Sequence, residues 1–175
     1  KAGLSAYVGK VNMDRNSPEF LIEDTHQSLA DTKEWLEASA QFGPLVKPII
    51  TPRFVPSCTS ELMSGLGNLA EAYNVPVQSH FSENHGEIDW VAALHPEAAN
   101  YTDVYYEHHL MGKVPTVMAH CIHLSDVEMD RMAETQTMVS HCPYSNVNLS
   151  SGIAPIRKLF ERKIPIGLGS DISGG

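Results

Sequence analysis

The sequence has 175 residues, of which 42% are hydrophobic and 19% are charged, and its formal net charge is −9. This composition is typical of a globular domain, and the acidic charge argues against binding to nucleic acid or to an anionic membrane. No apolar run reaches the roughly 20 residues that a transmembrane helix needs. The three cysteines, Cys58, Cys121 and Cys142, are widely spaced, which argues against a disulfide framework and favours a cytoplasmic location.

Six short apolar runs predict β-strands along the chain. Several are nearly continuous in Val, Ile and Met, which is typical of strands buried on both faces of a parallel sheet. The predicted strands cover residues 6–13, 46–54, 75–83, 116–124, 137–143 and 164–171.

Helical patterns lie between the predicted strands. Leu62, Leu66 and Tyr73 fall on one helical face that Thr59 or Ser60 can cap. Ser125 opens a capping box ahead of another helix. Further helices are predicted over residues 23–42, 86–94, 101–111 and 153–160.

The alternation of strands and helices predicts a parallel sheet with helical crossovers. Two architectures fit this order, an open doubly wound sheet and a closed (β/α)8 barrel. A complete barrel usually takes about 250 residues, so six strands would form an incomplete one. We therefore expect residues 1–175 to form a single partial barrel domain and to belong to a longer protein.

Polar and ionisable side chains follow the predicted strands at their carboxyl ends. His80 and Glu83 end the third strand, His120 ends the fourth and Asp171 ends the last. In a parallel α/β structure these ends meet at one face, where active sites are built. The pattern therefore predicts a site shared by several strands.

The residue types at these positions suit metal-assisted hydrolysis. Neutral imidazole and carboxylate groups bind zinc, and a bound zinc ion lowers the pKa of its water to about 7. A carboxylate outside the metal shell can then transfer protons. The set offers two ligands, whereas a catalytic zinc ion commonly has three, so further ligands are expected from elsewhere. On spacing alone, His120 could equally be structural, and Arg53 could be a surface cation or, with Phe54, a holder for a planar heterocycle.

Six stretches of the sequence resemble the amidohydrolase superfamily and, within it, the enzymes that deaminate guanine. The Ser-His-x-Ser-Glu-Asn and His-Cys-Pro-x-Ser-Asn motifs are shared with related deaminases and dechlorinating hydrolases, whereas Pro-Arg-Phe resembles the guanine-specific enzymes in particular. The resemblance implies an incomplete (β/α)8 TIM barrel, made of strands three to eight, in a zinc enzyme of purine catabolism that hydrolyses guanine to xanthine and ammonia. The matching stretches are residues 7–14, 51–54, 78–84, 118–120, 140–146 and 167–175.

The resemblance also implies roles for individual residues. His80 is the expected metal ligand from the fifth barrel strand, and Asp171 is both a ligand and the base that deprotonates the attacking water. Glu83 is the expected proton shuttle, and His120 orients the water. The expected purine-binding set is Arg53, Phe54, His80, Glu83 and Asp171.

The sequence also departs from the family pattern. The His-x-His pair of the first barrel strand has no counterpart here, nor do the first two strands or the small β-sandwich. We therefore expect the isolated chain to be inactive, with the remaining zinc ligands upstream, and the resemblance implies a homodimer for the intact protein. Two alternatives stay open: an amidohydrolase acting on a different aminated or halogenated heterocycle, and an assembly protein that has lost its metal.

Overall fold

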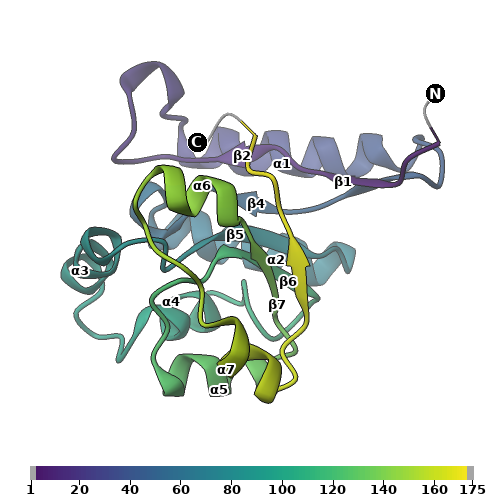
Figure 1. Cartoon of the computed structure of the whole chain (residues 1–175). Coiled ribbons are helices and arrows are strands. Elements are labelled where there is room, and N and C mark those ends of the chain that lie inside the picture. Colours follow the sequence, from purple (N-terminus) through teal and green to yellow (C-terminus); the bar gives the residue numbers. More distant parts are fainter. Residues whose placement is uncertain (1–2, 173–175) are drawn as a thin grey trace.

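The structure is a computed structural model that describes residues 3–172 (Figure 1). All of its paired strands run parallel. Strand β1 pairs with β3 and β2 with β4, whereas β5, β6, β7 and β8 form one sheet in that order. A bridge between Ile50 and Val77 joins the β3–β4 segment to β5. The strands are β1 Ala6–Val8, β2 Val11–Asn12, β3 Val46–Pro48, β4 Thr51–Pro52, β5 Val77–Phe81, β6 Thr116–His120, β7 Met138–His141 and β8 Ile166–Leu168.

Helices connect the paired segments β1–β2 and β3–β4 and each later strand to the next, which confirms the predicted parallel α/β organisation. Two short 3-10 turns, Glu19–Leu21 and Val55–Ser57, lie in the connections. The α-helices are α1 Thr25–Ser39, α2 Ser60–Tyr73, α3 His85–Leu94, α4 Tyr101–Glu107, α5 Asp126–Glu134, α6 Pro143–Asn148 and α7 Ile156–Glu161. None of the helices between residues 3 and 172 is long and apolar enough to span a membrane.

The predicted helix starts are confirmed where a capping side chain signalled them. The side chain of Thr59 accepts a hydrogen bond from the backbone N–H of Leu62 at 3.2 Å and caps α2. Ser125 and Glu128 form a complete capping box at the start of α5. These caps satisfy N–H groups that would otherwise lack partners at the helix ends.

The first two predicted strands are each broken into two short ones. Gly9 separates β1 from β2, and a Cβ atom there would lie 2.3 Å from the carbonyl oxygen of Ile49. The two segments therefore approach too closely for a side chain at position 9. In the second run, Pro48 has no N–H to donate, and β3 ends at that residue.

Some helices also differ from the prediction in their bounds, and one helix was not predicted. Helix α7 begins at Ile156 rather than at residue 153, because Ala154 precedes Pro155 and the residue before a proline avoids helical geometry. Helix α4 ends at Glu107 instead of residue 111. Helix α6 was not predicted, since six residues with little apolar periodicity give no readable helical signal.

The sheet has two faces with different roles. On β5, Val77 and Phe81 are fully buried in the hydrophobic core that the sheet shares with the helices. Gln78 and His80 point to the opposite face, where they line a cavity. The core therefore holds β5 firmly in place and presents His80 on the open side.

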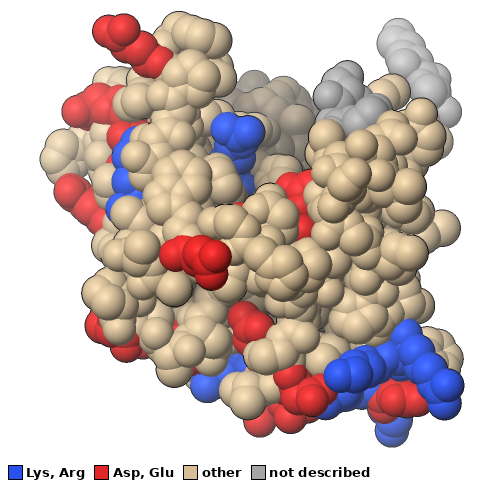
Figure 2. Space-filling view, turned by 60° about the vertical axis from the view of Figure 1, so that its left-hand side comes forward, with Lys and Arg blue, Asp and Glu red and all other residues tan. Residues whose placement is uncertain are grey.

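Helix α7 is held to α5 by surface ion pairs. Arg162 bonds to Asp126 at 2.9 Å and to Asp130 at 2.7 Å, and Lys158 lies 3.4 Å from Asp126. Basic and acidic side chains accordingly gather together at the lower right of Figure 2. Exposed pairs of this kind contribute little stability each, so buried Leu159 is the main anchor of α7.

The two outer strands leave apolar side chains exposed, and we expect the isolated chain to self-associate. Tyr7 on β1 is 53% exposed and Leu168 on β8 is 83% exposed. Unpaired strand edges with apolar flanks promote pairing with other chains. Light scattering should give a mass above the monomer value, and Leu168→Lys should lower it. A monodisperse monomer at high concentration would contradict this expectation.

Candidate active site

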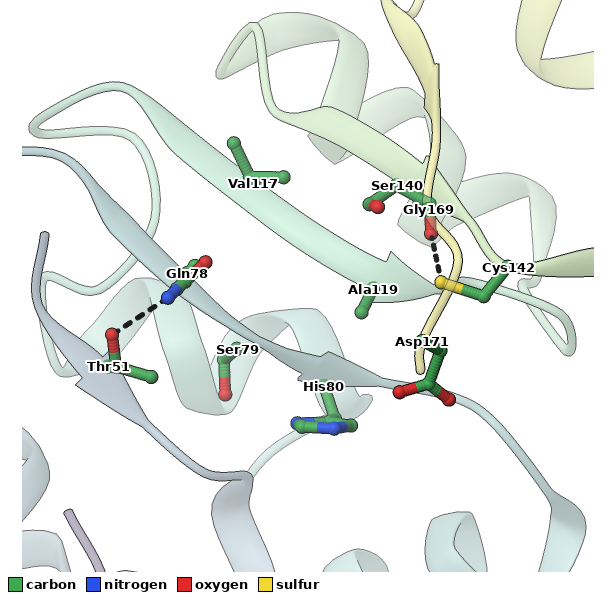
Figure 3. A pocket seen from close by; sticks show the side chains of 10 residues that line it. All are labelled: Thr51, Gln78, Ser79, His80, Val117, Ala119, Ser140, Cys142, Gly169 and Asp171. Atoms are coloured by element: carbon green, nitrogen blue, oxygen red, sulfur yellow. Dashed lines mark hydrogen bonds between the residues drawn. The ribbon is translucent and has the colours of Figure 1, made fainter. Parts of the chain in front are cut away.

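A cavity of about 240 Å³ lies at the carboxyl ends of the strands. It brings together all the residues predicted for the site, although they are up to 118 positions apart in the chain. Its lining comprises Arg53, Phe54, His80, Glu83, Asn84, Glu87, His120, Leu149 and Asp171. A second cavity of about 280 Å³ lies along the open face of the sheet and shares His80 and Asp171 with the first (Figure 3).

His80 is held in the form that binds a metal. Its Nδ1 atom lies 2.7 Å from the carbonyl oxygen of Arg53, an acceptor, so Nδ1 carries the proton and Nε2 keeps its lone pair. Burial lowers the pKa of His80, which favours the neutral imidazole. A backbone carbonyl on one ring nitrogen is the usual partner that orients a ligating histidine.

Asp171 faces the same hollow from β8. The residue follows the strand with a left-handed φ of 46°, which turns the chain away from the strand direction. Figure 3 shows its carboxylate and the ring of His80 directed into one cavity. An imidazole and a carboxylate sharing a hollow form a donor set that suits zinc. Within residues 3–172, no group of three or more His, Cys, Asp or Glu side chains is arranged to hold a metal ion.

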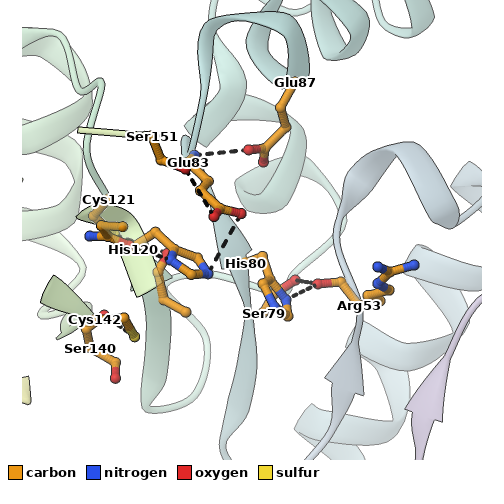
Figure 4. Close-up of polar contacts among 12 residues, drawn as sticks. Arg53, Ser79, His80, Glu83, Glu87, His120, Cys121, Ser140, Cys142 and Ser151 are labelled. Carbon is orange, nitrogen blue, oxygen red and sulfur yellow. Dashed lines mark hydrogen bonds and ion pairs between the residues drawn. The ribbon is translucent and has the colours of Figure 1, made fainter. Parts of the chain in front are cut away.

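His120 is buried behind His80 in an uncommon backbone conformation. Its φ is 70° and that of Cys121 is 53°, both left-handed values that non-glycine residues rarely adopt. The imidazole rings of His80 and His120 stack with centroids 5.3 Å apart. The left-handed turn directs His120 into the site, where its Nε2 lies 3.8 Å from Glu83 Oε2 (Figure 4).

Glu83 lies in the turn after β5 and is held at its backbone and at its carboxylate. Its backbone N–H donates to Glu87 Oε2 at 2.8 Å, and Ser151 Oγ donates to its Oε1 at 3.3 Å (Figure 4). Ser82 before it has a φ of 50°. The carboxylate therefore faces the cavity and His120, although Glu83 lies outside β5.

Arg53 and Phe54 form the far wall of the cavity. The guanidinium carbon of Arg53 lies 5.4 Å from the centre of the Phe54 ring, which also meets Trp90 edge-on at 6.3 Å. Within the described residues the Arg53 guanidinium has no hydrogen-bond or ion-pair partner, and the residue is exposed. The wall thus offers an aromatic surface and a set of free N–H donors.

Comparison with known proteins agrees with this arrangement. The family model described as "Amidohydrolase family" matches residues 1–175. The chain belongs to the amidohydrolase family.

Similar amidohydrolases include proteins that act on guanine. The chain is 52% identical to the guanine deaminase of Dictyostelium discoideum over 176 residues, which are 100% of this chain and 39% of that protein. A crystal structure of guanine deaminase from C. acetobutylicum with bound guanine in the active site superposes with a TM-score of 0.97 at 50% identity, covering 99% of this chain and 42% of that one.

A more distant structure shares the amidohydrolase fold. Atrazine chlorohydrolase from Arthrobacter aurescens TC1, complexed with zinc, has a TM-score of 0.86 at 18% identity and covers 98% of this chain and 39% of that one. At this identity the likeness shows the fold alone.

Sequence reasoning missed the residues that support this amidohydrolase site. Glu87 holds the backbone of Glu83, and Asn146 contacts His120. Tyr105 donates a hydrogen bond to the carbonyl oxygen of His80 at 2.7 Å. Asn146 belongs to the His-Cys-Pro-x-Ser-Asn motif, which was the one available signal for it; Glu87 and Tyr105 lie in ordinary helical patterns that carry no such signal.

Proposed function

We propose that this chain is part of a zinc-dependent enzyme that hydrolyses guanine to xanthine and ammonia. Residues 1–175 would form one domain, namely strands three to eight of a (β/α)8 barrel. The observation that carries the proposal is the convergence of the predicted ligand, proton-transfer and purine-binding residues on one cavity. The 50% identity to a structure with guanine in its active site supports the choice of substrate.

His80 and Asp171 would hold the zinc ion, through Nε2 and the carboxylate respectively. The neutral imidazole with a fixed Nδ1 proton supports His80 as a ligand, and the shared cavity supports Asp171. The remaining ligands would come from a segment outside this sequence. When bound, the metal would make its water acidic enough to ionise near neutral pH.

Arg53 and Phe54 would hold the purine. Phe54 offers a stacking face, and the guanidinium matches the O6 and N7 acceptors on one edge of guanine. Adenine carries an amino donor in place of O6, so it would face the guanidinium donors unfavourably. This wall therefore favours guanine.

Acidic and basic side chains around the cavity would move the protons. The water oxygen bonds to C2 of guanine while Asp171 accepts a proton from that water. Glu83 gives a proton to the ring nitrogen N3. C2 is then tetrahedral and carries both the hydroxyl and the amino group. Glu83 then takes the proton of the hydroxyl and passes it to the amino group, so that the C–N bond breaks, ammonia leaves and the hydroxyl oxygen becomes the C2 carbonyl of xanthine. The proton held by Asp171 returns to Glu83 for the next turnover. His120 would orient the water beside Glu83.

Replacing Arg53 by Ala should raise KM for guanine by about 10- to 100-fold, because a bidentate arginine–guanine contact is worth roughly 1–3 kcal/mol. Steady-state xanthine formation by the full-length enzyme measures it. Arg157→Ala, at an exposed position on α7, is the matched control. A KM unchanged by Arg53→Ala would show that Arg53 does not bind the purine.

A substrate panel and metal analysis of the full-length protein test the proposed function as a whole. Turnover of guanine in a protein that contains zinc is the expected result. Turnover of adenine, cytosine or a triazine without turnover of guanine would overturn the substrate assignment. A protein without bound metal and without activity would favour an assembly role. The homodimer and the cytoplasmic location stay predictions.

A further inference from the structure

Asn146 makes one side-chain contact that bears on the site. Its Oδ1 lies 2.9 Å from Nδ1 of His120, and both side chains are buried. Asn146 comes from α6, whereas His120 ends β6, so the contact joins two elements that are 26 positions apart. The opposite nitrogen of the same ring, Nε2, is the one that faces Glu83 at 3.8 Å.

The contact determines which nitrogen of His120 carries the proton. An amide oxygen only accepts hydrogen bonds, so Nδ1 must donate and therefore bears the hydrogen. Nε2 of the neutral ring is then left with a lone pair directed toward Glu83 and the cavity. Without the oxygen at 2.9 Å, the ring could turn or carry its proton on the other nitrogen.

Asn146 contributes little to the stability of the fold. Its Nδ2 is a buried donor without a hydrogen-bond partner among the described residues. A buried unsatisfied donor is destabilising, which offsets the benefit of the bond that Oδ1 makes. The amide is thus better suited to orienting His120 than to stabilising α6.

We propose that Asn146 is a positioning residue for the deamination, which holds His120 with the proton on Nδ1 and Nε2 turned toward Glu83. This inference rests on the proposed function. Asn146 is buried against His120 and is not among the residues that line the cavity, so it would act through His120.

Two variants that keep the number and branching of the side-chain heavy atoms separate positioning from folding. Asn146→Leu removes the acceptor and the unsatisfied donor together, whereas Asn146→Asp keeps an acceptor oxygen. Asn148→Leu, an exposed position on the same helix, is the matched control. Each variant of the full-length enzyme is measured for kcat and KM with guanine, for zinc content and for its unfolding temperature.

We expect Asn146→Leu to lower kcat by about 10- to 100-fold, as for other residues that orient a functional histidine, with KM, zinc content and unfolding temperature close to wild type. Asn146→Asp should recover several-fold of that loss, and Asn148→Leu should behave as wild type. Equal kcat in wild type and Asn146→Leu, or no recovery in Asn146→Asp, would overturn the role of Asn146. A wild-type enzyme that does not turn over guanine would instead overturn the proposed function.

Discussion

Replacing Glu83 by Gln is expected to lower kcat for guanine by about 10²- to 10⁴-fold while zinc stays bound. Gln has the size of Glu and can still accept the hydrogen bond from Ser151, but its amide cannot transfer a proton to N3 or to the leaving amine. The loss should therefore be confined to the chemical step. Xanthine formation and elemental analysis of the same full-length preparation measure both quantities.

Glu34→Gln is the matched control, because Glu34 is exposed on α1 and is not among the residues lining the cavity. It should leave kcat, KM and zinc content unchanged. Near-normal turnover in Glu83→Gln would exclude Glu83 as the proton shuttle. Loss of zinc in that variant would instead indicate that Glu83 supports the metal.

Replacing His80 by Ala is expected to remove both zinc and activity. The imidazole is one of only two ligands that this part of the protein would contribute. Burial lowers its pKa and favours the neutral ring, and the Arg53 carbonyl oxygen fixes the proton on Nδ1. Zinc content should fall from about one ion per chain to near zero, and guanine turnover should fall below detection. Dialysis against zinc should not restore it.

His26→Ala controls for the loss of a histidine, since the His26 side chain is 83% exposed on the surface. It should keep full zinc content and turnover. Unchanged zinc binding in His80→Ala would contradict the assignment of His80 as a ligand. If His80→Ala keeps one zinc ion per chain but does not turn over guanine, His80 takes part in the reaction and does not bind the metal.

The parallel α/β order could be predicted because strands and helices alternate and because capping residues such as Thr59 and Ser125 mark the starts of helices. The residues of the cavity could be predicted for a related reason. Carboxyl ends of parallel strands meet at one face, so polar residues that follow several strands converge. The structure places Arg53, His80 and Asp171 around one hollow, as that rule requires.

Tertiary contacts account for what the sequence did not indicate. The break at Gly9 depends on the approach of Ile49, which lies 40 positions away. The left-handed backbone at His120 directs its ring into the site, and a strand-like sequence carries no sign of it. Asn146 acts through a contact with another element, so its role was not visible from its position in α6.

The most direct test of the account is the position of the zinc ion in crystals of the full-length enzyme, located by anomalous scattering at the zinc absorption edge. We expect one peak at the shared wall of the two cavities, at about 2.0–2.2 Å from His80 Nε2 and from an oxygen of Asp171. A zinc peak that lies elsewhere, or that touches one of these residues but not the other, would contradict the account.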